Sequence, residues 1–309
     1  LLYYIGQKDH GLAEWTRSTE LDGTFAVALR NVGFAYGQKG EWQKAMGYYD
    51  RAIKANPDDA LLFTESDKIY ESANVDAAAR LKRLESNIKT VMKHDDAVMR
   101  LLSLYNVTGK YDKAIQIMHN RHFHLWEGGG QIHGIYADSH MLKGMTLLAK
   151  KNYQKAIQEF DLATQYPANL EVAPSYRGGY EAKAYYLAGE AYEGMKQAGK
   201  AQEFYQKAAE AKCPGGLKDL SYYQVKALQK FGNNTEASAA LKKMEENLSR
   251  IRQNAVDSYA KFGDSNKNEQ ESNIAFYSAL IHLLKNEPTE AQSDLRQAIQ
   301  LNPGNIWAG

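Results

Sequence analysis

The sequence predicts an all-α protein, an α-α superhelix in which about fifteen or sixteen antiparallel helices form a right-handed solenoid of stacked hairpins. An alanine is repeatedly followed, four residues later, by an aromatic or large apolar residue and then by another small residue. This pattern is clearest at Ala45-Tyr49-Ala52, Ala156-Phe160-Ala163, Ala201-Tyr205-Ala208 and Ala291-Leu295-Ala298. The low proline content, 6 in 309 residues, is typical of a chain that is mostly helical. Because one hairpin cannot bury its own apolar face, the recurrence implies a stack.

Composition narrows the class of protein. A hydrophobic content of 44% is sufficient for a continuous core, and a net charge of +1 predicts neither nucleic acid nor an anionic membrane as a partner. The single cysteine, Cys213, excludes an intrachain disulfide framework and leaves a cytoplasmic or a periplasmic location open. No apolar stretch approaches the roughly 20 residues of a membrane span.

The clearest unit runs from Ala26 to Asp59. Small and apolar residues alternate at spacings of three and four on two predicted helices, with a glycine turn between them and a proline after the second. The residues are Leu29, Val32, Gly33 and Tyr36, then Gly40, then Ala45, Tyr49 and Ala52, then Pro57. This unit resembles the tetratricopeptide repeat, a 34-residue helical hairpin, and the resemblance implies a repeat solenoid.

Positions equivalent to Ala45 divide the rest of the chain. We predict a truncated repeat at 1–25 and repeats at 26–59, 60–94, 95–122, 137–166, 180–213, 218–247 and 272–305. Insertions are predicted at 123–136, 167–179 and 248–271, the last lengthening a helix through Tyr259 before a polar loop at 263–268. The unit at 60–94 matches least well, with Arg83 and Asn87 in apolar and small positions. Because the chain begins inside a unit, we expect it to be a piece of a longer protein.

The first two insertions should be neighbours, because stacked units place equivalent turns on one edge. They carry a predicted binding patch of histidine, aromatic, acidic and arginine side chains beside glycines that permit close backbone approach. Its residues are His122, His124, Trp126, Glu127, His133, Tyr176 and Arg177. Imidazole is a common metal ligand, but the spacing matches no metal motif, so we predict no metal and no cofactor.

No catalytic motif is present. The stretch 194–201 resembles a phosphate-binding loop but has Ala201 where magnesium needs Ser or Thr, and no strand precedes it. The chain has no Gly-x-Ser-x-Gly element. We therefore predict that this segment is not an enzyme.

First helices of such repeats line a concave groove, and the side chains expected there mix apolar, aromatic and charged groups, which suits a peptide, a protein or the chain's own upstream domain. The predicted groove residues are Arg30, Phe34, Met99, Met141, Met145, Tyr186, Glu190, Tyr222, Lys226 and Phe276.

Three segments together, 25–33, 126–129 and 167–170, resemble the C-terminal tetratricopeptide region of large bacterial proteins with a preceding β-rich domain of unknown function. That family is often suspected of carbohydrate association. The resemblance adds an alternative to the interaction scaffold, namely an accessory domain of a carbohydrate-binding or carbohydrate-active protein. Trp126, the histidine cluster and Arg177 would then contact a sugar or a missing catalytic domain.

Overall fold

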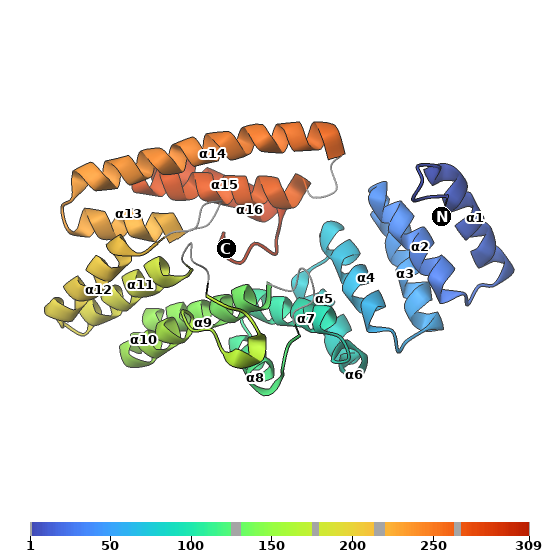
Figure 1. Cartoon of the computed structure of the whole chain (residues 1–309), viewed down its shortest axis with the longest axis horizontal. Helices are drawn as coiled ribbons and strands as arrows, with labels where there is room; N and C mark the ends of the chain where they lie inside the picture. Colours follow the sequence, from blue (N-terminus) through green and yellow to red (C-terminus); the bar gives the residue numbers. More distant parts are fainter. Residues whose placement is uncertain (1, 125–130, 175–178, 213–219, 263–266, 309) are drawn as a thin grey trace. The chain divides into compact units, whose positions relative to one another are not determined.

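The computed structural model describes residues 2–124, 131–174, 179–212, 220–262 and 267–308. These residues contain sixteen α-helices and no strand, which confirms the all-α prediction (Figure 1). The chain divides into two compact units, Leu1–Leu104 and Tyr105–Gly309. Among the described residues, none of the helices is both long enough and apolar enough to span a bilayer.

The first unit is built from short helices joined by tight turns. They are α1 (Lys8–Leu21), α2 (Ala26–Gln38), α3 (Trp42–Ala55), α4 (Ala60–Ser72), α5 (Ala77–Ser86) and the single turn α6 (Ile88–Val91). Helix α7 (Asp95–Val107) begins in this unit and ends in the second.

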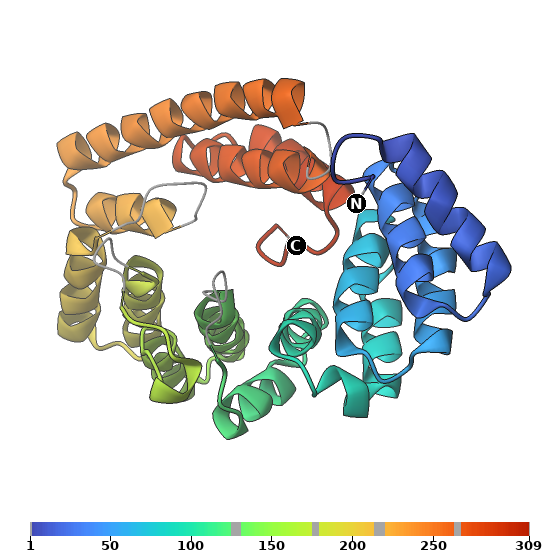
Figure 2. The same ribbon diagram turned by 45° about the vertical axis from the view of Figure 1, so that its right-hand side comes forward.

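The second unit continues the pairing of helices, which the turned view in Figure 2 shows clearly. Its helices are α8 (Tyr111–Asn120), α9 (Gln131–Ala149), α10 (Tyr153–Leu162), the 3-10 turn η1 (Ala168–Leu170), α11 (Glu181–Gly194), α12 (Ala198–Glu210), α13 (Leu220–Lys230), α14 (Asn234–Phe262), α15 (Lys267–Leu284) and α16 (Pro288–Leu301). Helix α14 passes through Tyr259, as predicted. Lys267 and Asn268 begin α15 and do not belong to a loop.

In the described residues, seven helix pairs are each joined by a turn of the same type. Two residues after the end of each first helix stands a residue with a left-handed backbone. The N–H of the next residue donates to the carbonyl five residues back at 2.8–3.1 Å. This is the bonding of a Schellman cap, which satisfies the last carbonyls of the helix and reverses the chain. The left-handed residues are Gly40, Asn74, Gly109, Lys151, Lys196, Gly232 and Asn286.

Close approach of the paired helices depends on glycine. In three hairpins a buried glycine of the first helix faces an aromatic ring of the second, sixteen residues later. A Cβ built on the glycine would lie 2.5–2.9 Å from that ring, closer than real Cβ atoms pack. The pairs are Gly33–Tyr49, Gly144–Phe160 and Gly189–Tyr205. The rings are 1–5% exposed, so they have little room to move.

The hairpin α4–α5, which matches the repeat pattern least well, is held by charge. Arg80 of α5 donates to both carboxylate oxygens of Asp67 on α4, at 3.0 and 2.8 Å, and Arg100 of α7 donates to Asp67 at 2.6 Å. The side chains of Asp67 and Arg80 are 2% and 4% exposed. Arg83 lies 4.4 Å from the Tyr70 ring and donates to Ser66 Oγ, so it too bonds inside the hairpin.

Burial alone would raise the pKa of Asp67. The hydrogen bonds and positive charges of Arg80 and Arg100 outweigh that effect and hold the pKa of Asp67 below its ordinary value. Its contribution to stability is therefore complete above about pH 4, the ordinary range of an unfolded aspartate, and is lost as the pH falls through the lowered folded value.

The glycine contact can be tested by a matched pair of substitutions in one hairpin. We expect Gly33→Ala to destabilise the protein by about 1–2 kcal/mol, because the new methyl group meets the Tyr49 ring. Gly47→Ala on α3 meets nothing within 4 Å and should stabilise by about 0.5–1 kcal/mol through helix propensity. Denaturant unfolding followed by circular dichroism measures both. Equal stabilisation by the two variants would contradict the close approach.

The buried ion pair gives a second prediction. Asp67→Asn leaves the buried Arg80 charge without its carboxylate and should destabilise by about 3–5 kcal/mol at pH 7. Asp50→Asn is the control, because Asp50 is 52% exposed and pairs with Arg83 at the surface, so about 0–1 kcal/mol is expected. Unfolding curves at pH 7 and pH 3 should show a smaller acid loss in Asp67→Asn than in the wild type. An equal loss would contradict the assigned role of Asp67.

Candidate functional site

In the first unit, Arg30 bonds to a neighbouring helix, whereas the predicted groove residues Phe34 and Met99 are half-buried. Arg30 of α2 donates from Nε to Glu65 Oε2 of α4 at 2.7 Å and from Nη2 to the other carboxylate oxygen. Tyr49 donates to the same carboxylate at 3.1 Å. Phe34 is half-buried, with its ring 6.1 Å from that of Tyr3, and Met99 is half-buried on α7. The charge of Arg30 is therefore already neutralised by Glu65.

In the second unit, four of the predicted groove residues gather on α11 and α13. Lys226 Nζ lies 4.8 Å from the centre of the Tyr186 ring, 5.6 Å from that of Tyr222 and 4.0 Å from Glu190 Oε1. Burial, and then the negative charge of Glu190, raise the pKa of Tyr186. The structure thus assembles an aromatic face with one cation and one anion at its surface.

Three of the predicted groove residues belong to the core. The exposed fractions of Met141, Tyr186 and Phe276 are 0%, 1% and 7%, and Met145 packs half-buried against the same core as Met141. First-helix side chains here fill the space between successive hairpins. We therefore treat Met141, Tyr186 and Phe276 as supports of the face and not as its contact surface.

A segment at 303–308, after α16, covers part of this face. Trp307 packs against two core clusters, one containing Tyr186 of α11 and one containing Phe276 of α15. Its ring centre lies 3.1 Å from Lys183 Nζ, and that lysine is only 1% exposed. The centre of the Tyr223 ring, on α13, lies 5.4 Å from the same Lys183 Nζ. The Trp307 side chain thus packs near side chains of α11, α13 and α15.

Specific hydrogen bonds hold the 303–308 segment. Asn305 Nδ2 donates to Ser272 Oγ on α15 at 3.0 Å, and Ser272 donates to the Ala298 carbonyl of α16 at 2.8 Å. The Ala308 N–H donates to the Asn305 carbonyl at 3.1 Å, which closes a turn around Trp307. Hydrogen bonds of the 303–308 segment and apolar contacts of the ring therefore both fix the position of the Trp307 indole.

The residues of the predicted loop patch do not all lie together. His122 and His124 are exposed and meet Glu171, whereas His133 is buried on α9, stacks on Tyr166 at 3.9 Å and bonds the Gln165 carbonyl. Sequence reasoning therefore grouped histidines that the fold separates. The remaining predicted patch residues, Trp126, Glu127, Tyr176 and Arg177, lie outside the described residues.

The described ends of the two insertions contact each other through a backbone bond. The Phe123 N–H donates to the Asn169 carbonyl at 2.8 Å. The Asn169 side chain donates to the carbonyls of Met118 and Arg121, each at 2.7 Å. Phe123 is 2% exposed and anchors its segment in the core. These contacts fix the two chain segments that carry His122, His124 and Glu171.

Sequence reasoning missed Glu171, Lys183 and Trp307. Glu171 directly follows the 167–170 segment that we singled out, so an acidic residue beside a predicted histidine patch was available as a signal. Ile306-Trp307-Ala308 is an apolar run after the stop signal Asn302-Pro303-Gly304, which indicates a segment that packs back on the fold. Nothing in the local sequence indicates that Lys183 is buried.

Three segments match the tetratricopeptide repeat family, at residues 26–59, 137–169 and 182–212. The chain contains tetratricopeptide repeats. These three matches are the hairpins that carry the glycine–aromatic contacts. Tetratricopeptide repeats generally serve as interaction scaffolds without catalysis of their own. The wider division of this repeat protein into units and insertions stays a prediction.

Solved structures with a similar chain path include other repeat proteins. A tetratricopeptide repeat protein from Parabacteroides merdae ATCC 43184 is 17% identical, over 89% of this chain and 93% of that one, with a TM-score of 0.46. YrrB, described as a tetratricopeptide-repeat protein with an unusual peptide-binding site, is 16% identical over 63% and 91%, with a TM-score of 0.43. The apo form of RapI is 12% identical over 97% and 82%, with a TM-score of 0.47.

The contact between the insertions gives a further prediction. Asn169→Ala removes both hydrogen bonds to the Met118 and Arg121 carbonyls, so the Phe123 amide should exchange with solvent about tenfold faster. Asn120→Ala is the control, because that side chain donates to the Gln116 carbonyl of its own helix, α8. Hydrogen exchange followed by NMR measures both. An unchanged Phe123 rate in Asn169→Ala would contradict the assigned contact.

Proposed function

We propose that this repeat protein is a non-catalytic interaction scaffold that binds a peptide segment on the face formed by α11, α13 and α15. The ligand on this face is an aromatic side chain followed by a small residue on a turn. In this chain, the 303–308 segment provides such a ligand from within the molecule. The observation that carries the proposal is the Trp307 ring on the buried Lys183 ammonium, 3.1 Å from ring centre to Nζ.

Cation–π contact explains why an aromatic side chain is selected there. A desolvated ammonium against an indole face contributes about 2 kcal/mol, more than the same pair contributes in water. Lys183 is 1% exposed, so its charge is shielded from solvent, and an occupant without a ring would leave it without this contact. The face therefore favours tryptophan or tyrosine over an aliphatic side chain of similar size.

The polar groups beside the aromatic site suit the backbone or termini of a peptide. Glu190 and Lys226 are half-buried on α11 and α13, 4.0 Å apart, next to the half-buried Tyr222. Charged groups at the rim of an aromatic site set orientation more than affinity. We propose that a bound segment places its ring near Lys183 and its polar groups near this pair.

The carbohydrate alternative depends on Trp126, Arg177 and the histidine cluster. Trp126 and Arg177 lie outside the described residues, and His122 and His124 contact Glu171. The same holds for contact with an upstream domain of the chain. Both stay predictions from the sequence.

The test is binding in trans. In Trp307→Ala the face loses its internal occupant, so this variant should bind the peptide Asn-Pro-Gly-Asn-Ile-Trp-Ala-Gly, a copy of residues 302–309, at least about tenfold more tightly than the wild type does. The same peptide with alanine in place of tryptophan should not bind. Isothermal titration calorimetry measures all three, and circular dichroism checks that the variant stays folded.

Two further variants locate the site. Trp42→Ala removes a half-buried tryptophan from the first unit and should leave peptide binding at the wild-type level. Trp307→Ala combined with Lys183→Met removes the cation while keeping the side-chain length, and should weaken binding by about tenfold or more. A folded Trp307→Ala variant that binds neither peptide would overturn the proposal, and the 303–308 segment would then be a cap for the last hairpin only.

A further inference from the structure

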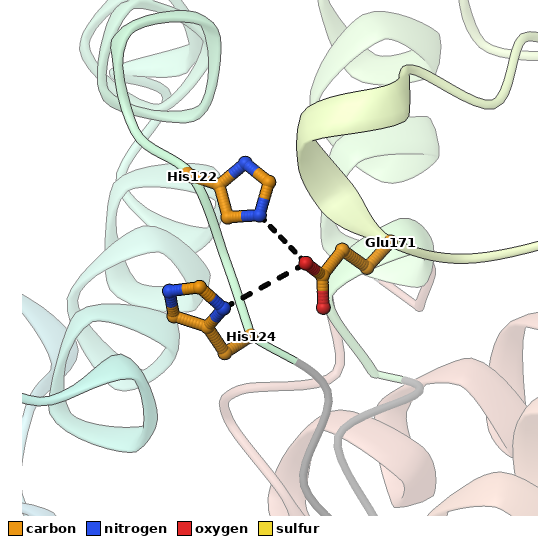
Figure 3. A group of neighbouring side chains, drawn as sticks. All are labelled: His122, His124 and Glu171. Atoms are coloured by element: carbon orange, nitrogen blue, oxygen red, sulfur yellow. Dashed lines mark hydrogen bonds and ion pairs between the residues drawn. The ribbon is translucent and has the colours of Figure 1, made fainter.

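His122, His124 and Glu171 converge on one point at the described ends of the first two insertions. Figure 3 shows both imidazole rings directed at the same carboxylate. His122 Nε2 lies 2.6 Å from Glu171 Oε1, and His124 Nδ1 lies 3.6 Å from that oxygen. One donor atom from each residue lies within 4.8 Å of the other two, and all three residues are exposed.

An extended backbone places His122 and His124 on the same, solvent-exposed side of their segment. His122 and His124 are exposed while Phe123 between them is 2% exposed, which is the alternation of an extended segment. Two contacts of Phe123 fix that segment: its ring is buried in the core, and its backbone N–H donates to the Asn169 carbonyl. The two imidazole rings are consequently held with their centres 4.8 Å apart.

Glu171 has an unusual backbone conformation. Its φ is +52°, a left-handed conformation that costs a non-glycine residue about 1–2 kcal/mol. Among the described residues, the other non-glycine residues with positive φ all stand in the Schellman turns of hairpins, namely Asn74, Lys151, Lys196 and Asn286. Glu171 instead follows η1, and its conformation turns the carboxylate toward the histidines. Local strain of this kind is concentrated at functional sites.

The donor set is that of a transition-metal site. Two imidazole nitrogens and one carboxylate oxygen are preferred ligands of Zn²⁺ and of related divalent ions, and three protein ligands leave one position open. Ligand bonds of about 2.0–2.2 Å in a tetrahedron put donor atoms about 3.3–3.6 Å apart. The donor atoms lie within 4.8 Å of one another, and the closest pair, His122 Nε2 and Glu171 Oε1, is 2.6 Å apart, so these separations bracket the tetrahedral spacing.

We propose that His122, His124 and Glu171 bind a divalent first-row transition metal ion, with Zn²⁺ as the first candidate. The ion would link the segment after α8 to the segment after η1 and would offer an open coordination position to water or to an anionic ligand. This proposal is independent of the peptide site on α11, α13 and α15.

The competing explanation is an ordinary histidine–glutamate surface pair, and metal titration separates the two. Purified protein without an affinity tag, stripped with a chelator and dialysed, is titrated with ZnCl₂ by calorimetry. We expect one Zn²⁺ per chain, and the bound metal should be released in acid because imidazole must lose its proton to ligate. CoCl₂ provides an optical signal of the coordination geometry.

Variants identify the ligands. His124→Gln and Glu171→Gln should each weaken Zn²⁺ binding by at least about tenfold, and both replace exposed side chains, so folding should be preserved. His119→Gln is the matched control, because it removes a nearby exposed histidine outside the cluster and should leave binding unchanged.

A second readout is thermal stability. Saturating Zn²⁺ should raise the unfolding temperature of the wild type and of His119→Gln but not of Glu171→Gln, since only a ligated ion links the two segments. The proposal is overturned if the wild type binds no Zn²⁺, or if His124→Gln and Glu171→Gln bind it as tightly as the wild type.

Discussion

The close approach of two helices within each hairpin is the constraint on which the rest of the structure depends. In three hairpins a glycine in the first helix faces an aromatic ring of the second, and in seven described hairpins a left-handed residue with a Schellman cap reverses the chain between the two helices. Because a hairpin buries only its inner face in this way, its outer apolar residues must pack on the next hairpin. The side chains of α11 and α13 that remain at the surface form the face proposed here for a ligand, and buried side chains lie beneath them.

Charge replaces apolar packing where the pattern weakens. The α4–α5 hairpin has no glycine–aromatic contact, and a carboxylate shared by two arginines holds α4, α5 and α7 together. Such pairs demand specific geometry, because either charge left alone in the interior is costly. Lys183 is a second buried cation, and the Trp307 ring lies against its ammonium group.

The sequence predicts the helical class, the hairpins and much of the core, because small and aromatic residues recur at helical spacing and mark the helix faces that meet. It does not predict the contacts between distant segments. Glu171 meets His122 only because Asn169 joins two insertions, and Trp307 reaches α11 only because the chain turns back after α16. Burial of Met141 and Tyr186 was also missed, since periodicity shows that a side chain lies on a first helix but not how deeply the neighbouring hairpin covers it.

The central claim is that the face of α11, α13 and α15 accepts an aromatic side chain over the Lys183 ammonium. The most direct measurement is the NMR spectrum of the Lys183 side chain in the folded protein, with nuclear Overhauser contacts to the Trp307 indole. Because the ring centre lies 3.1 Å from Nζ, the protons on Cε should be shifted strongly upfield and should show contacts to the indole. Protons at their random-coil position without such contacts would contradict the account.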